Sequence, residues 1–348
     1  MRRALAVVAA LAALAAGSCA TVPPRSAVAP VSDAELRATI AVLSDDRFEG
    51  RMSGTVGEQR TIAYLTEELT RRGAVGGMPD GSFTMRFAIA AQKRTVPPEG
   101  GGLPAGQAEF TRAINAAGVT ASHNVIGRVL GRRPDGRAVL LMAHWDHLGL
   151  CRPAGAPDRI CNGAVDNASG TAAVLALVER VRALKLDRDV WFVFTGAEEW
   201  GLLGAKAFAA APPLPLASIV AGFNLDTIAV APKGMPVAIV APPNSPLEPL
   251  VRSATRALGR KWDGDGEAAA FIQRQDGWPL AQRGVPMAMA GGSFSDMARL
   301  RAFFTGAYHG PEDELTPASD LGGAVEDANL HLELVRRAAS RSFRPGRR

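Results

Sequence analysis

The chain has 348 residues, of which 47% are hydrophobic and 21% charged, a composition that fits a globular enzyme and excludes an intrinsically disordered protein. Its formal net charge of +5 depends on eight arginines, namely Arg2, Arg3 and six within residues 336–348. Because the rest of the chain has a small net negative charge, we expect no nucleic-acid partner, and we expect residues 341–348 to form a basic, disordered tail.

The first 31 residues predict export. Residues 1–19 combine arginines, an apolar stretch and small residues before Cys19, which is the pattern of a signal peptide and not of a membrane anchor in the mature protein. The segment "AAGSC" resembles the lipobox of bacterial lipoproteins, so Cys19 is a candidate for acylation, and cleavage after Ala20 is the alternative. Residues 20–31 then form a Pro-rich linker. The expected location is the periplasm or cell envelope, with a lipid on Cys19 as a route to the outer membrane.

The two remaining cysteines, Cys151 and Cys161, are close enough in sequence to pair. Disulfides persist outside the inner membrane, so a bond between them is expected there, and two unpaired thiols are the alternative.

One domain is expected over residues 32–340, since no composition break divides this range. Two N-terminal helices are predicted by capping boxes that pair Ser32 with Glu35 and Thr55 with Glu58. Residues 83–89 alternate between apolar and polar side chains, which predicts a half-buried strand near a sheet edge.

From residue 124 onward, continuous apolar runs alternate with helical segments. The runs cover residues 138–143, 190–194, 218–225 and 284–290. A continuous run is typical of a strand that is covered on both faces. A helical pattern lies between the first two runs, and the order strand, helix, strand predicts an α/β domain with a largely parallel sheet.

Polar side chains follow three of these runs closely. They are His144 after the first run, Glu198 and Glu199 after the second, and Asp226 after the third. Open parallel sheets bind ligands beyond the carboxyl ends of their strands, so these side chains are expected to share one crevice. Asp166, at the start of the predicted helix, and His309, in a later loop, are expected to join them. Two histidines and several carboxylates are typical zinc ligands, and their number is enough for a site that holds more than one ion.

Each of these features alone has a structural explanation. Asp166 could serve only as a helix cap, and adjacent glutamates could only complement a helix dipole. Their joint occurrence at the ends of successive buried strands favours a metal site.

The segments "AHWDHLG", "NGAVDNASGTAAVLALV", "FTGAEEWGLLGAKAF", "FNLDTI" and "YHGPEDEL" resemble the secreted bacterial double-zinc aminopeptidases of metallopeptidase clan MH, and the similarity covers most of the chain. The resemblance implies an α/β three-layer sandwich with a mixed, mostly parallel central sheet flanked by helices, of the zinc-peptidase or phosphorylase/hydrolase-like type. No inserted domain is expected between residues 83 and 123.

The resemblance also implies two Zn²⁺ ions per chain. The implied ligands are His144 and Asp226 for one ion, Glu199 and His309 for the other, and Asp166 as the bridge. Asp146 would be the carboxylate that orients His144, and a cis peptide bond would join Asp166 to Asn167.

The implied activity is hydrolysis of the N-terminal peptide bond of peptides with a free N-terminus. Glu198 would be the general base for a water shared by the metals, and Tyr308 would donate a hydrogen bond to the oxyanion, a packed aromatic being its alternative role. An acidic crevice would attract the protonated α-amine of the substrate.

Two other functions stay open. One is a single-zinc acyltransferase similar to glutaminyl cyclases, which share the fold, and the other is a non-catalytic binding domain. His123, His147 and His331 are expected to have structural or surface roles. Residues 274–286 depart from the family pattern at the expected wall of the substrate pocket.

Overall fold

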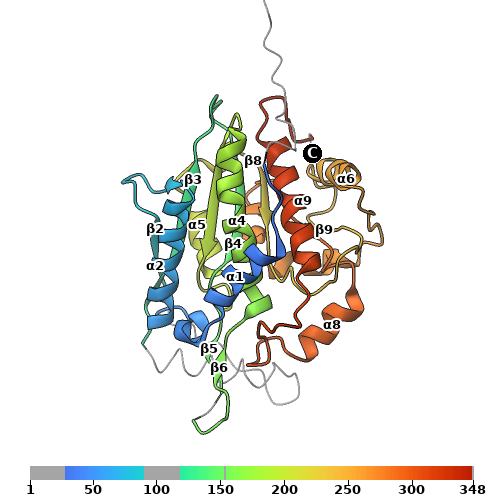
Figure 1. Cartoon of the computed structure of the whole chain (residues 1–348). Helices are drawn as coiled ribbons and strands as arrows, with labels where there is room; N and C mark the ends of the chain where they lie inside the picture. Colours follow the sequence, from blue (N-terminus) through green and yellow to red (C-terminus); the bar gives the residue numbers. More distant parts are fainter. Residues whose placement is uncertain (1–27, 90–117, 153, 347–348) are drawn as a thin grey trace, which may run out of the picture.

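The computed structural model describes residues 28–89, 118–152 and 154–346 (Figure 1). The signal peptide at residues 1–19, with Cys19, and most of the linker expected at residues 20–31 lie outside the described residues. The same holds for residues 90–117, so the expectation of no insertion there stays a prediction. No helix in the described ranges is long and apolar enough to cross a membrane.

A mixed sheet forms the centre of the domain. Within the described residues its strands are β1 (Val75–Gly76), β2 (Thr84–Ala88), β3 (Ala121–Val129), β4 (Ala138–His144), β7 (Asp189–Thr195), β8 (Ile219–Asn224), β9 (Ala238–Val240) and β10 (Met287–Gly291). Their order is β1-β3-β7-β4-β8-β10-β9, with β2 paired to β3. The four central strands β7, β4, β8 and β10 pair in parallel, and the outer pairings are antiparallel, so that only β3 and β9 run opposite to the other described strands of the sheet. The predicted mixed, mostly parallel sheet is confirmed.

Helices cover both faces of this sheet and complete three layers. In Figure 1 the helices α1 (Asp33–Leu43), α2 (Val56–Arg71), α4 (Ser169–Leu184) and α9 (Gly322–Ala338) lie over one face. The opposite face is covered by α5 (Leu203–Ala210) and α7 (Gly277–Ala281). Two more helices, α6 (Glu248–Ala257) and α8 (Met297–Thr305), lie beside β9 and the C-terminal part of the chain.

The core explains why the strands appear as continuous apolar runs. Along β4, Val139 and Leu141 belong to the core on the α4 side, whereas Leu140 and Met142 belong to the core that includes Phe208 of α5. Both sets are fully buried. A strand between two helical layers has no solvent-facing side, so the alternation of polar and apolar residues disappears.

The N-terminal elements also agree with the sequence. The Oγ of Ser32 accepts a hydrogen bond from the Glu35 N–H at the start of α1, and Thr55 caps α2 through the Gly57 N–H. Glu58 differs from its expected role, because its carboxylate accepts from the Gly54 N–H and contacts His123 instead of completing a capping box. Strand β2 has the expected half-buried pattern and pairs with β3.

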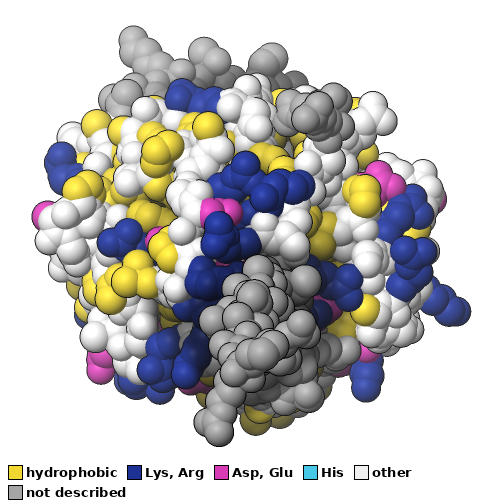
Figure 2. All heavy atoms as spheres, turned by 90° about the horizontal axis from the view of Figure 1, so that it is seen from above, with side chains coloured by type: hydrophobic (Ala, Val, Ile, Leu, Met, Phe, Trp, Pro, Cys, Tyr) yellow, Lys and Arg dark blue, Asp and Glu magenta, His cyan; other side chains and the backbone are white. Residues whose placement is uncertain are grey.

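The start of the basic C-terminal segment packs against the domain. The buried guanidinium of Arg188 donates to the carbonyls of Ala338 and Phe343, and Phe343 packs against the main core. The Arg341 N–H donates to the carboxylate of Asp187. The expectation of a disordered tail from residue 341 therefore does not hold for residues 341–343. Phe343 makes apolar contacts that the charge pattern does not reveal. Figure 2 views the end of the molecule where this segment lies and shows Lys and Arg side chains gathered there.

Arg51 links the N-terminal region to two loops at the opposite end of the sheet. Its guanidinium is fully buried and donates to the carbonyl oxygens of Leu43, Trp145, Asn162 and Gly163 at 2.6 to 2.9 Å. Burial lowers the pKa of Arg51 to about 10, which leaves the group charged at neutral pH. The loops after β4 and before α4 are thus held by one side chain.

We expect Arg51→Lys to destabilise the protein by about 2 to 4 kcal/mol, because an ammonium has three donors and no planar fork with which to reach four buried carbonyls. Denaturant unfolding measures this loss. Arg47→Lys is the control, since the Arg47 side chain is 77% exposed and should tolerate the change. Equal unfolding midpoints for the two variants would contradict this role of Arg51.

Candidate metal centre

The carboxyl edge of the sheet gathers the polar residues singled out in the sequence. His144 is the last residue of β4, Glu198 and Glu199 follow β7, and Asp226 follows β8. Asp166 lies in the short π-helical turn Ala164–Ala168 that precedes α4, and His309 lies in the loop after α8. Because β7, β4 and β8 are neighbours in the sheet, their ends meet at one place, as expected from the sequence.

Asp166 lies between two histidines. Its Oδ1 is 3.1 Å from Nε2 of His144, and its Oδ2 is 3.3 Å from Nε2 of His309. A second carboxylate accompanies each histidine, with Asp226 Oδ1 at 3.4 Å from His144 and Glu199 Oε2 at 2.9 Å from His309. The two oxygens of Asp166 thus face two separate sets of donors, the arrangement in which one carboxylate can bridge two cations.

The donor set fits zinc. Imidazole nitrogens and carboxylate oxygens are zinc ligands, and the ligand atoms of His144, Asp166 and Asp226 lie within 4.8 Å of one another. Burial raises the pKa of Asp146 to about 8 and that of Asp276 to about 6, and the nearby carboxylate of Glu199 contributes to both shifts. A bound cation would supply the compensating positive charge.

Asp313 fixes the backbone of Asp166. Its carboxylate accepts hydrogen bonds from the N–H groups of Val165 and Asp166 at 2.8 and 3.0 Å. The peptide bond between Asp166 and Asn167 is cis, as the resemblance implied. No local sequence pattern predicts this role for Asp313, and its place in the segment "YHGPEDEL" is the only signal for it.

Asp146 differs from its expected role. The Nδ1 of His144 lies 3.2 Å from the backbone oxygen of Asp146, whereas the carboxylate is 3.9 Å away. The carboxylate instead accepts from the Glu198 N–H at 3.0 Å, which satisfies a backbone donor in the site. The Asp146 carbonyl therefore orients His144, and its side chain positions the turn that bears Glu198.

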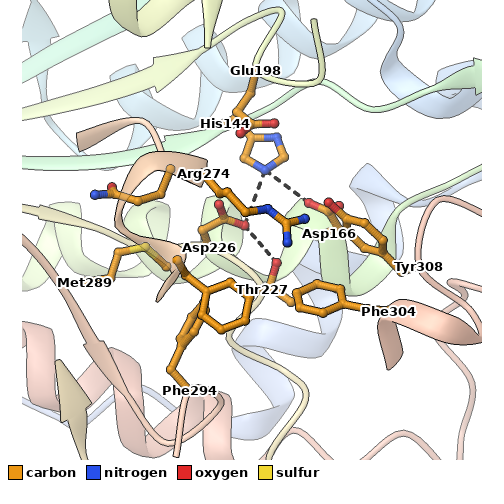
Figure 3. A pocket seen from close by; sticks show the side chains of 12 residues that line it. His144, Asp166, Glu198, Asp226, Thr227, Arg274, Met289, Phe294, Phe304 and Tyr308 are labelled. Carbon is orange, nitrogen blue, oxygen red and sulfur yellow. Dashed lines mark hydrogen bonds and ion pairs between the residues drawn. The ribbon is translucent and has the colours of Figure 1, made fainter. Parts of the chain in front are cut away.

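The adjacent glutamates face different partners. Glu199 contacts His309, and its other oxygen is 2.8 Å from Nδ1 of His147. Glu198 lines a pocket beside His144 (Figure 3). His147 is fully buried in the site, so a surface role for it is excluded, and the sequence pattern did not assign it this contact.

The other two histidines have structural contacts. His123 pairs with Glu58, and His331, buried in α9, lies 2.7 Å from the Asp327 carbonyl oxygen.

The pocket beside these residues has a polar floor and an aromatic wall. It is lined by His144, Asp166, Glu198, Asp226, Thr227, Phe271, Arg274, Gln275, Met289, Phe294, Phe304 and Tyr308. Tyr308 stacks on His309 with a centroid distance of 3.6 Å and packs against Phe304. Burial raises the pKa of Tyr308 well above its usual range, so its hydroxyl is protonated and can donate a hydrogen bond.

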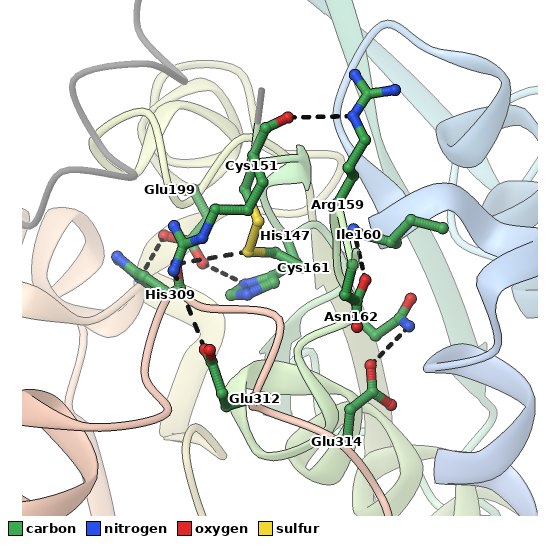
Figure 4. Close-up of a disulfide and its surroundings, with 12 residues drawn as sticks. His147, Cys151, Arg159, Ile160, Cys161, Asn162, Glu199, His309, Glu312 and Glu314 are labelled. Carbon is green, nitrogen blue, oxygen red and sulfur yellow. Dashed lines mark hydrogen bonds and ion pairs between the residues drawn. A yellow bond between two sulfur atoms is a disulfide. The ribbon is translucent and has the colours of Figure 1, made fainter. Parts of the chain in front are cut away.

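Cys151 and Cys161 form a disulfide, so the alternative of two unpaired thiols is wrong. The bond joins the ends of the small sheet of β5 (Gly149–Leu150) and β6 (Ile160–Cys161), and Cys161 Sγ lies 3.4 Å from the carbonyl oxygen of His309 (Figure 4). The disulfide therefore packs against the loop that bears His309.

Histidines and carboxylates gathered at the carboxyl edge of a mostly parallel sheet, beside a pocket, are typical of a metal-dependent enzyme. Residues 124–332 match peptidase family M28, and the chain belongs to this family.

Known proteins similar to this chain include peptidases and a cyclase. The "Alkaline phosphatase isozyme conversion protein" of Escherichia coli K12 is 27% identical over 166 residues, which are 46% of this chain and 41% of that protein. The chain therefore spans less than half the length of this curated relative.

Among solved structures, the zinc aminopeptidase BSAP of Bacillus subtilis is 17% identical, with a TM-score of 0.65 over 90% of this chain and 96% of that one. A glutaminyl cyclase of Tannerella forsythia is 18% identical, with a TM-score of 0.60 over 88% and 99%. These structures share the fold.

We expect Asp313→Asn to weaken zinc binding by about 10- to 100-fold, because asparagine offers one acceptor oxygen and turns its NH₂ group toward the second backbone donor. Competition with a chromogenic chelator measures the affinity. Glu312→Gln is a matched control, since the neighbouring Glu312 side chain is 66% exposed. If both variants bound zinc like the parent chain, Asp313 would have no part in holding Asp166.

Proposed function

We propose that this member of peptidase family M28 is an aminopeptidase that uses two zinc ions to hydrolyse the N-terminal bond of peptides. The observation that carries the proposal is the position of Asp166, whose two oxygens face the separate pairs His144–Asp226 and His309–Glu199. Such ions, when bound, act as Lewis acids and lower the pKa of water. The similarity to BSAP, a zinc aminopeptidase, supports the same assignment.

Glu198 is the general base in this proposal. Its carboxylate lines the pocket, and the Asp146 carboxylate holds its backbone N–H. From this position Glu198 can take a proton from the attacking water and pass it to the leaving amine. Glu199 is engaged by His147 and His309 and is therefore assigned to metal binding.

Tyr308 stabilises the oxyanion that develops on the scissile carbonyl. Its ring is fixed between His309 and Phe304, and its side chain lines the pocket. A preorganised hydroxyl donor of this kind contributes ~3 kcal/mol of transition-state stabilisation.

The acidic floor of the pocket favours substrates with a free, protonated N-terminus. Glu198, whose carboxylate is not a proposed zinc ligand, lines the pocket, and its negative charge attracts an ammonium group. The proposed partners are therefore peptides, and the charge pattern of the sequence argues against a nucleic-acid partner. We place the enzyme in the periplasm or cell envelope because of the export pattern in residues 1–19, with a lipid on Cys19 as the proposed anchor.

A second candidate is glutaminyl cyclisation, which the structural likeness to the Tannerella forsythia enzyme favours. A cyclase of this fold needs a single zinc and releases ammonia from N-terminal glutamine. The second pair of donors, Glu199 with His309, favours the peptidase. Membership of a peptidase family, with all proposed ligands present, argues against a non-catalytic binding domain.

We expect Glu198→Gln to reduce kcat by about 10²- to 10⁴-fold while zinc content stays unchanged, because the proton acceptor is lost and the ligands are kept. Glu199→Gln should instead lower the zinc content. Steady-state kinetics and elemental analysis of both variants separate the two roles. An active Glu198→Gln enzyme would refute the proposed base.

We expect N-terminally free aminoacyl p-nitroanilides to be cleaved and N-acetylated ones to resist, because an acetyl group removes the ammonium that the acidic floor attracts. Chelation should abolish turnover, and added zinc should restore it at a stoichiometry near two per chain. Cleavage of blocked substrates would overturn the exopeptidase assignment. Pyroglutamate formation from N-terminal glutamine, with one zinc per chain, would establish the cyclase instead.

A further inference from the structure

Arg274 places a cation in the proposed active-site pocket. It is the last residue of the 3-10 helix η5 (Glu267–Arg274), and its side chain lines the same pocket as Asp166, Glu198 and Tyr308. Figure 3 shows its guanidinium directed toward the space between Asp226 and Tyr308. It also begins the segment at residues 274–286 that departs from the resembled family pattern.

Aromatic rings, and not carboxylates, hold this guanidinium. Its central carbon lies 5.7 Å from the ring centre of Phe271 and 5.3 Å from that of Phe304. Within the described residues, no ion pair or hydrogen bond joins Arg274 to an acidic side chain. The ring contacts keep the charge in place while its N–H donors stay available.

Three acidic residues line the pocket with Arg274, namely Asp166, Glu198 and Asp226. Asp166 and Asp226 contact His144, and within the described residues none of the three forms an ion pair with Arg274. Its planar fork of donors matches a carboxylate, which it can bind through two parallel hydrogen bonds.

We infer that Arg274 binds a carboxylate of the substrate near the scissile bond, an inference that rests on the proposed peptidase function. Arg274 would thereby select short anionic peptides. Two sources supply such a group, namely the C-terminal carboxylate of a dipeptide and an acidic side chain on the N-terminal residue. The wall formed by Phe271, Phe294 and Phe304 provides apolar contact beside the charge. A lysine could keep the charge but not the bidentate geometry.

Two kinetic comparisons test this inference and distinguish the sources. The first compares Leu-Leu with Leu-Leu-amide, and the second compares Glu-p-nitroanilide with Gln-p-nitroanilide. The parent enzyme should prefer the carboxylate member of at least one pair by about 10- to 100-fold in kcat/KM, mainly through KM. Arg274→Gln should abolish that preference, and Arg274→Lys should restore part of it. Arg301→Gln, at an arginine whose side chain is 74% exposed, is the control and should keep the preference.

A binding measurement keeps this inference separable from the proposed function. In the Glu198→Gln background, calorimetric titration with the two Leu-Leu peptides reports the carboxylate preference without turnover, and a further Arg274→Gln substitution should remove it. If the parent chain hydrolysed no peptide while the Glu198→Gln chain still bound the carboxylate peptide selectively, the results would support Arg274 and refute the peptidase. Equal kcat/KM within both pairs in the parent enzyme, or equal loss on every substrate in Arg274→Gln, would overturn the role of Arg274.

Discussion

The position of Asp166 is the constraint on which the rest of the site depends. Its carboxylate contacts His144 on one side and His309 on the other, and these residues reach it from β4 and from a loop more than 150 residues later. Asp313 holds the Asp166 backbone through two N–H groups. Parallel pairing of β7, β4 and β8 then brings the remaining carboxylates to the same edge. The order of the strands therefore determines which side chains can act as metal ligands. The contacts of the loops determine where these side chains meet.

The site is maintained against unfavourable backbone geometry. Ala197, Thr227 and His309 all have positive φ angles, of 52, 53 and 59°, and each adjoins or is a residue of the site. Residues other than glycine in this region cost about 1 kcal/mol or more each, so surrounding contacts must fix them. Thr227 donates to Asp226 at 2.9 Å, and its N–H donates to Asn167. The carboxylate of Asp226 is thus aimed by a turn that its neighbours hold in place.

Sequence patterns predicted the elements whose signals are local. Strands covered on both faces appear as apolar runs, and helix caps depend on residues two or three positions apart, so β4, β7, α1 and α2 could be predicted. The residues at the strand ends followed from the same topology. Asp313, His147 and Arg51 could not be found this way, because each acts through contacts across the fold, such as the 147 residues between Asp313 and Asp166. Periodicity carries no information on such pairs.

The sequence predicted the residues of the site better than the atoms through which those residues act. Asp146 was expected to orient His144 through its carboxylate, but the backbone carbonyl lies closer, and the carboxylate is taken by the Glu198 N–H. Asp146 therefore links two parts of the site. Its backbone carbonyl orients His144 at the end of β4, and its carboxylate positions the turn after β7 that bears Glu198. The left-handed Ala197 begins that turn, and it lets Glu198 face the pocket while Glu199 faces His147 and His309. Glu198 and Glu199 are adjacent in sequence and can still have different functions, because the backbone of the turn at Ala197 and Glu198 is held in one conformation.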